Sequence, residues 1–238
     1  NSITSMGEGV FYNCSKLQSA NIPTNITSVP YSTFNSCSQL NSVTLHDGIN
    51  TIGAYAFAYC QALPSIALND SIKRIYYYAF YNCSSLVIDA LPATLTEIGY
   101  SAFAGTKAIT AHLTLPETLT TVGNNAFEGS GITGITIPKV INGFDTGVFY
   151  ECKSLATVNL PMGMTRIPDY TFYYTTALKS IMLPTSLTEI GSYAFYNGGV
   201  TSVALPSTLT TIGSYAFAYS KLTRLFFVCS EHLKQKKE

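Results

Sequence analysis

Apolar residues recur along this chain in a pattern that repeats about every 23 residues. The clearest marker is a phenylalanine, which returns ten times at intervals of 22 to 24 residues. The ten positions are Phe11, Phe34, Phe57, Phe80, Phe103, Phe127, Phe149, Phe172, Phe195 and Phe217. A period of this length is typical of a solenoid, in which each repeat forms one coil and shares its core with the neighbouring coils.

Each repeat contains two short segments that are predicted to be extended. The consensus is L-x-x-I-x-L-P-x-x-L-T-x-I-G-x-x-A-F-x-x-C, and residues 63–83 give a clear copy of it. The I-x-L part alternates apolar and polar residues, which predicts a strand with one buried face. The proline that follows in many copies ends the strand because it has no N–H to donate. The L-T-x-I part predicts a second extended run, and the glycine after it permits a tight corner.

The A-F-x-x-C part of the repeat predicts a brief helical turn with Ala, Phe and Cys on its buried side. At about two turns it is too short to be stable without packing. We therefore predict an α/β fold: a right-handed leucine-rich repeat solenoid of about ten coils of 22–24 residues. A parallel β-sheet would form its concave face, with short helical turns and short extended segments elsewhere, and the phenylalanines would form one continuous column.

The predicted solenoid spans residues 1–229 as a single domain with a truncated first repeat, and a charged tail occupies residues 230–238. Because the chain opens in the middle of the pattern, with Ile3 and Met6 already at repeat positions, we interpret it as a piece of a longer protein. A missing targeting signal is then uninformative.

The I-G-x-x-A-F-x-x-C signature, present in residues 52–60 and in a close variant in residues 212–220, resembles the BspA-like leucine-rich repeats of bacterial surface proteins. The resemblance covers roughly residues 3–227. Three residues after the strand, where the general leucine-rich motif carries Asn or Cys, this chain has residues such as Ser71, Thr118, Ser186 and Thr208. The resemblance implies a secreted or cell-surface protein with an adhesin-like role, whose partners would be host extracellular matrix or other cells.

The charge balance excludes one class of partner. The chain carries 13 basic and 13 acidic side chains, and its only lysine cluster lies in a tail that also holds Glu231 and Glu238. Nucleic-acid binding requires clustered Lys and Arg, so we expect no nucleic-acid partner. No apolar run approaches the ~20 residues that span a bilayer. We expect a monomer without a membrane-spanning segment.

The cysteines and histidines do not predict a metal or catalytic site. Five cysteines (Cys14, Cys37, Cys60, Cys83 and Cys152) share the slot three residues after Phe, which elsewhere holds Ser or Thr. We therefore expect buried free thiols, with pairing between adjacent coils as the alternative, and an exposed thiol at Cys229. The paired C-x-x-C spacing of zinc sites is absent. His46, His112 and His232 are far apart in the repeat, and no residue completes a triad with them. We predict no enzyme and no cofactor.

Two further features test the predicted register. Many of the 17 tyrosines flank the phenylalanines, and we expect them to cover the helical-turn edge; a binding surface at that edge is the alternative.

Asp89 falls at an inward strand position, where an unpaired carboxylate is costly to bury. We therefore expect a local bulge that turns Asp89 outward and Ile88 inward.

Outward strand positions define the candidate ligand-binding concave face: Thr44, His112, Thr114, Thr136, Asn159, Met182 and Arg224. This face is neutral and rich in hydroxyl groups, and it lacks the Trp, Tyr and Arg stripe of many interfaces. Our first hypothesis is a non-enzymatic binding module that recognises an extracellular protein or glycan through the solenoid surface. The alternative is a structural spacer that presents another domain.

Overall fold

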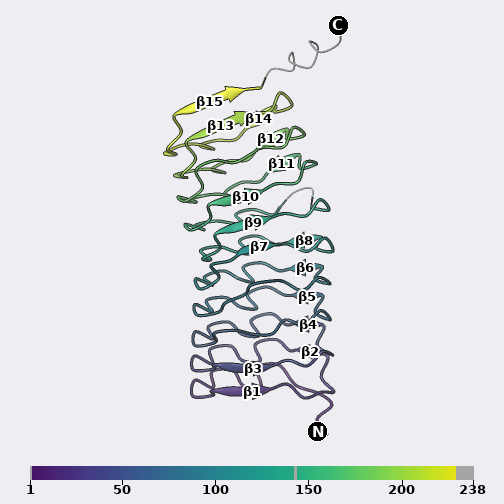
Figure 1. Cartoon of the computed structure of the whole chain (residues 1–238). Coiled ribbons are helices and arrows are strands. Elements are labelled where there is room, and N and C mark those ends of the chain that lie inside the picture. Colours follow the sequence, from purple (N-terminus) through teal and green to yellow (C-terminus); the bar gives the residue numbers. More distant parts are fainter. Residues whose placement is uncertain (1, 142–143, 229–238) are drawn as a thin grey trace.

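The computed structural model describes residues 2–141 and 144–228. They form a stack of coils that runs from strand β1 to strand β15, and each coil lies on the one before it (Figure 1). Two columns of short strands follow the stack, and all of their pairings are parallel. The predicted parallel-sheet solenoid is therefore confirmed.

The first column is built from the I-x-L segments. Its strands are β1 (Ser19–Asn21), β3 (Ser42–Thr44), β7 (His112–Thr114), β9 (Gly134–Thr136), β10 (Thr157–Asn159), β13 (Ser202–Leu205) and β15 (Arg224–Phe227). They pair as β1-β3, β7-β9-β10 and β13-β15. Side chains alternate between core and solvent, so Leu113 is buried while His112 and Thr114 are exposed. We call the outward side of this column the sheet face.

The second column is built from the L-T-x-I segments. Its strands are β2 (Ser28–Val29), β4 (Thr51–Ile52), β5 (Arg74–Ile75), β6 (Glu97–Ile98), β8 (Thr121–Val122), β11 (Arg166–Ile167), β12 (Glu189–Ile190) and β14 (Thr211–Ile212). They pair as β2-β4-β5-β6-β8 and β11-β12-β14. Like residues stack in register, as Ile52 on Ile75 and Ile75 on Ile98.

Between the two columns, hydroxyl groups fasten each coil to the preceding one. Thr118 Oγ1 donates to the carbonyl oxygens of Ala93 and Leu95, at 2.7 and 2.8 Å. Ser186 Oγ donates in the same way to Met162 and Met164, at 2.6 and 2.8 Å. At Thr118, Ser186 and Thr208, the hydroxyl that replaces the Asn or Cys of the general motif therefore satisfies backbone carbonyls of the neighbouring coil. Ser71 is different, because its own N–H donates to Asn69 Oδ1.

The segment around each phenylalanine is not helical, so the predicted helical turns and the α/β class are wrong: the described residues contain strands, turns and bends but no helix. The reason lies in the hydrogen bonds. The N–H groups of Tyr55, Phe57 and Tyr59 donate to carbonyl oxygens of the next coil, at 2.7 to 3.1 Å. The N–H groups between them, as at Ala56 and Ala58, bond three residues back in the same coil. An α-helix would need all of these donors for its own carbonyls.

Residues with left-handed backbone conformation allow successive N–H groups to bond alternately to the next coil and within their own coil. Each coil has two residues with φ between 48° and 73°, placed two positions before and two positions after its phenylalanine. Of these residues, sixteen are not glycine, and eight are tyrosines: Tyr55, Tyr59, Tyr78, Tyr170, Tyr174, Tyr193, Tyr215 and Tyr219. A bulky residue is rarely left-handed because its Cβ crowds the backbone. The coil-to-coil bonds outweigh that cost.

The ten phenylalanines form the predicted column. Nine successive pairs are stacked, with ring centroids 5.0 to 5.9 Å apart. Phe103 and Phe127 are fully buried, and their planes differ by 8°. Further along the first column, Ile88 is buried and Asp89 is exposed, as expected from the cost of burying the Asp89 carboxylate.

The thiols form a second column beside the phenylalanines. Cys37, Cys60, Cys83 and Cys152 are buried and unpaired, which confirms the predicted slot, and each Sγ donates to a phenylalanine carbonyl of the preceding coil at 2.9 to 3.2 Å. Cys14 shares the slot but is exposed, because it lies in the first described coil, which is covered on one side only. Cys229 lies outside the described residues.

Candidate binding surfaces

The structure places all seven candidate residues on the sheet face, at four separate places. Thr44 ends β3, and Arg224 begins β15 at the other end of the stack. His112, Thr114, Thr136 and Asn159 lie together on the three-stranded segment β7-β9-β10. Met182 follows on the next coil, where the column continues as the bridge between Ser180 and Ser202. The seven residues therefore do not form one site, but four of them do meet.

Three of these four residues, His112, Thr136 and Asn159, belong to a hydrogen-bonded cluster on the sheet face. His112 Nε2 lies 2.9 Å from Thr136 Oγ1, and Asn159 Nδ2 donates to the same oxygen at 3.0 Å. His112 Nδ1 lies 3.2 Å from Thr157 Oγ1, two coils away. Thr114 pairs with Thr136 in the strand register. Because each hydroxyl both donates and accepts, one continuous network fixes the imidazole and the amide.

A glycine makes room for this network. Gly134 pairs with both His112 and Thr157, so it lies between the two residues that the imidazole joins. A Cβ at Gly134 would collide with His112 Nδ1 and Thr157 Oγ1. The sequence showed a small residue at this position, but not that an imidazole lies over it.

The cluster has little of what catalysis requires. The His112 ring is exposed and bonds to the hydroxyls of Thr136 and Thr157, and no carboxylate of the described chain orients it. A His–hydroxyl pair becomes a nucleophilic site when a third group aligns the base and donors await an oxyanion. The arrangement instead presents fixed donors and acceptors to a ligand.

Beyond Asn159 the sheet face carries large exposed apolar side chains. The Met182 side chain is 86% exposed, and Phe226 of β15 is 51% exposed. Met182 separates two shallow hollows, one of about 340 Å³ toward Asn159 and Met162 and one of about 140 Å³ toward Val228. Exposed methionines suit protein contacts because the thioether chain adapts to irregular surfaces.

The segments around the phenylalanines form one edge of the stack, which we call the turn edge. This edge carries two groups of tyrosines, each linked by ring contacts. The first tyrosine cluster contains Tyr31, Tyr55, Tyr59, Tyr77, Tyr78, Tyr81 and Tyr100. The second tyrosine cluster contains Tyr150, Tyr170, Tyr173, Tyr174, Tyr193, Tyr196, Tyr215 and Tyr219. The coil of Phe127 separates them, because Asn124, Asn125, Glu128 and Gly129 fill its flanking positions.

The two clusters expose different parts of their rings. In the second cluster Tyr150, Tyr173 and Tyr196 stack face to face, with centroids 4.5 and 5.0 Å apart, so both faces of the middle ring, Tyr173, are covered. Burial, and next the neighbouring Tyr173, raise the pKa of Tyr150 to about 12, so its phenol stays neutral. In the first cluster most contacts run edge to face, as between Tyr55 and Tyr77.

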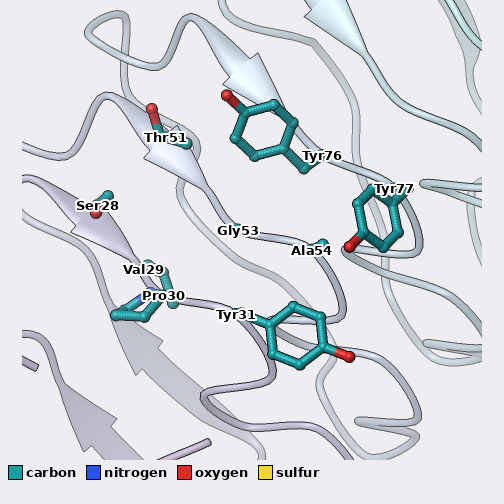
Figure 2. Close-up of a pocket in the computed structure, with 9 residues that line it drawn as sticks. All are labelled: Ser28, Val29, Pro30, Tyr31, Thr51, Gly53, Ala54, Tyr76 and Tyr77. Atoms are coloured by element: carbon teal, nitrogen blue, oxygen red, sulfur yellow. The ribbon is translucent and has the colours of Figure 1, made fainter. Parts of the chain in front are cut away.

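A hollow of about 350 Å³ opens beside the first cluster. Figure 2 shows Tyr31 on one side of the Gly53–Ala54 segment and Tyr76 and Tyr77 on the other. The lining residues are Ser28, Val29, Pro30, Tyr31, Thr51, Gly53, Ala54, Tyr76 and Tyr77. We call this hollow the tyrosine groove. Sequence reasoning missed this groove. Its signal is the small pair Gly53 and Ala54, which lies between larger residue pairs in the preceding and the following coil.

Other candidate residues are structural or stand apart. His46 Nε2 lies 3.1 and 2.9 Å from the carbonyl oxygens of Pro23 and Ile26, while Nδ1 accepts from the Gly48 N–H. This histidine therefore joins two coils. His232 lies outside the described residues. Across residues 2–141 and 144–228, no group of three His, Cys, Asp or Glu side chains is arranged to hold a metal ion. The same ranges contain no helix that is long and apolar enough to cross a bilayer.

Comparison with known families identifies the repeat. The family described as "BspA type Leucine rich repeat region (6 copies)" matches residues 4–111 and 96–224. The chain belongs to this family. The BspA-type signature thus accounts for the coil core and corners, whereas the His112 cluster and the tyrosine groove depend on residues outside it.

Solved structures of bacterial leucine-rich repeat proteins are similar to this chain. A leucine-rich repeat protein from Bacteroides ovatus shares 25% identity, with a TM-score of 0.66 over 94% of this chain and 55% of that one. A leucine-rich cell surface protein from Faecalibacterium prausnitzii shares 21% identity, with a TM-score of 0.55 over 96% of this chain and 78% of that one. The chain spans about half the length of the Bacteroides ovatus protein. No curated protein matches this BspA-type chain.

Proposed function

We propose that this chain is a non-enzymatic binding module of a secreted or cell-surface protein, with an adhesin-like role, and that it recognises an extracellular protein through the sheet face. The observation that carries the proposal is the fixed polar cluster of His112, Thr136, Thr157 and Asn159 beside the exposed Met182. Membership of the BspA-type family and the likeness to a Faecalibacterium prausnitzii cell surface protein support the location.

The dimensions of the sheet face suit a protein partner. Strands of one column lie about 4.8 Å apart, so the five steps from Thr114 to Phe226 span about 24 Å. A standard interface buries about 800 Å² on each partner, which corresponds to a patch of similar width. The polar cluster would orient the partner, while Met182 and Phe226 would supply the apolar contact that interfaces concentrate at their centre.

The test is binding to a panel of immobilised extracellular-matrix proteins. Thr136→Lys and Met182→Lys place a charge in the polar and apolar parts of the sheet face, and each is expected to lower affinity at least tenfold. Thr211→Lys is the matched control, because Thr211 is exposed on β14 in the other strand column. Melting temperatures of all three variants should stay within a few degrees of the parent.

A spacer function is the second candidate, favoured by the continuous stack of nine phenylalanine pairs. A column that is packed without interruption resists bending and would hold another domain at a distance. If the parent chain binds no protein in the panel, or if neither lysine variant weakens binding, the sheet face is not the recognition surface and the spacer function gains support.

A further inference from the structure

We propose that the tyrosine groove is a binding site for a neutral sugar ring. The groove lies on the turn side of the β2-β4-β5 strands, whereas the sheet face belongs to the other strand column. It therefore adds a second recognition site that does not depend on the proposed sheet-face function.

The width of the groove follows from the repeat. The coil in the middle contributes Gly53 and Ala54, and the coils on either side contribute Pro30 with Tyr31 and Tyr76 with Tyr77. Two coil spacings separate the flanking backbones by about 10 Å. A flat ring held between two walls needs about 3.5–4 Å on each side. Because Tyr55 lies between Tyr31 and Tyr77, the open part of the gap is over Gly53, between Pro30 and Tyr76, and this part admits one ring.

The tyrosine rings of the groove are accessible to solvent: Tyr31 is 42% and Tyr77 is 45% exposed, and Tyr76 is partly exposed. Tyr76 makes no ring contact with another aromatic residue of the described chain, unlike the stacked tyrosines of the second cluster. Tyr55 contacts both Tyr31 and Tyr77 with interplanar angles of 69° and 88°. These contacts run edge to face, so Tyr55 supports both side chains without stacking parallel to either ring. Aromatic faces carry partial negative charge and attract the C–H groups that cover one side of a sugar ring.

The polar groups of the groove match a neutral polyol. All polar side chains among its nine lining residues are hydroxyls: Ser28, Thr51 and the three tyrosines. Thr51 Oγ1 already donates to Asn50 Oδ1 at 2.8 Å, which leaves its lone pairs to accept from a ligand. Hydroxyls donate and accept, as sugar hydroxyls do. With no charged side chain in the lining, the groove has nothing to balance a phosphate, a sulfate or an amine.

The ligand has room to continue beyond one ring. Tyr31 also lines a neighbouring hollow of about 390 Å³, together with Glu8, Gly9, Tyr12, Ser32, Asn35 and Tyr55, and the Glu8 carboxylate can accept hydrogen bonds from sugar hydroxyls. A ring in the groove and a second ring in this hollow would lie on either side of Tyr31. The site therefore fits the end of an oligosaccharide better than a free monosaccharide.

The repeat itself supplies variants that should fold. Tyr31, Tyr77 and Tyr100 occupy the slot of Ala54 in other coils, so Ala54→Tyr fills the groove with a residue that the fold accepts. Gly53 and Gly99 occupy the slot of Tyr76, so Tyr76→Gly removes one wall in the same way. Tyr215→Gly is the control: Tyr215 is 61% exposed in the second cluster, and its φ of 56° suits glycine.

The experiment measures binding of maltotriose, lactose and chitotriose to the full chain by saturation-transfer NMR and calorimetry. For at least one sugar we expect saturation of ring C–H protons, at least tenfold weaker binding in Ala54→Tyr and Tyr76→Gly, and unchanged binding in Tyr215→Gly. Retained binding in Thr136→Lys would separate this site from the sheet face. The proposal is overturned if none of the three sugars binds, if both groove variants bind as the parent does, or if the groove instead binds a decaproline peptide that Ala54→Tyr excludes.

Discussion

The amide N–H of Phe57 donates to the carbonyl oxygen of Ala79 at 2.8 Å, across the boundary between two coils. The same bond recurs around other phenylalanines, as from Phe80 to Ala102 and from Phe172 to Ala194. Because it takes the donor that a helix would use, the turn segment must place left-handed residues on both sides of the phenylalanine. The stability of the coil therefore depends on backbone conformation as much as on the apolar core.

Substitutions at Tyr59 distinguish this turn from a helix. Tyr59 has a φ of 61°, and Gly105 and Gly129 hold the same slot in other coils. Tyr59→Gly should be more stable than Tyr59→Ala by about 1 kcal/mol, because alanine is penalised in the left-handed region. A helix would reverse the order by a similar amount. Urea unfolding of the two variants measures the difference, and a more stable alanine variant would contradict the observed turn.

Removing a ring from the phenylalanine column should be costly. Phe103 is fully buried between Phe80 and Phe127. Phe103→Ala leaves a cavity in a column that cannot collapse around it, and we expect the free energy of unfolding to fall by about 3–5 kcal/mol. Phe226→Ala serves as the control, because that ring is half exposed. Comparable losses in the two variants would argue against a rigid column.

The buried thiols predict a loss of stability at alkaline pH. Burial raises the pKa of Cys37 to about 11 and those of Cys83 and Cys152 to about 12, from an ordinary value near 9.0. Above pH 9 the unfolded chain releases these protons while the folded chain keeps them, so the free energy of unfolding falls as pH rises from 9 toward 11. The loss is absent at neutral pH.

Cys152→Ser isolates one thiol, because Ser130 and Ser220 hold the same slot in other coils. This variant should lose less stability than the parent between pH 7 and pH 10.5 in urea titrations. At pH 8 a thiol reagent should label Cys14 in the native chain and Cys37, Cys60 and Cys83 only after denaturation. Rapid native labelling of the three buried thiols would contradict their burial.

Gly134 and His112 should be energetically coupled. Gly134→Ala forces the imidazole away from Thr157, and overpacking of this kind costs about 1–3 kcal/mol. In a His112→Ala background the same change should cost less, because the main obstacle is gone. A double-mutant cycle measured by denaturant unfolding gives the coupling. Strictly additive effects would show that the imidazole does not rest over Gly134 in solution.

The fold was predictable where the sequence repeats. The alternation of Val43 with Leu45 and the spacing of the phenylalanines set both the strands and the buried column. Asp89 falls at an inward position of that register, and the cost of burying its carboxylate correctly predicted that Asp89 lies outward and Ile88 inward. Hydrophobic periodicity indicates which side chains are buried, and in a solenoid the same buried pattern recurs in every coil.

The turn segment was not predictable from the same signal. Ala56, Phe57 and Cys60 have the spacing of a helical face, but a helix and an alternating turn can bury the same three residues. What distinguishes them is backbone conformation at Tyr55 and Tyr59, and tyrosine gives no sign of a left-handed φ. The asparagines and glycines at the equivalent positions, such as Asn82 and Gly105, were the available clue.

The candidate surfaces were predictable only in part. The repeat register alone was enough to place Thr136 and Asn159 at adjacent outward positions. The bonds from His112 to Thr136 and Thr157 could not be predicted in this way, because they depend on side-chain rotamers and on the space above Gly134. The tyrosine groove required comparison of three successive coils at one slot, where Ala54 breaks a row of tyrosines. A consensus drawn from all repeats hides such differences between individual coils.

The bonds between coils also decide how the molecule responds to tension. A pull applied at the two ends of the stack loads the contacts between coils in series, since each coil touches only its neighbours. The weakest junction yields first, and one released coil of 23 residues adds about 80 Å of slack where about 5 Å of stacked height had been. The stack is therefore rigid under small loads and extensible under large ones, and it absorbs mechanical work by unwinding one coil at a time.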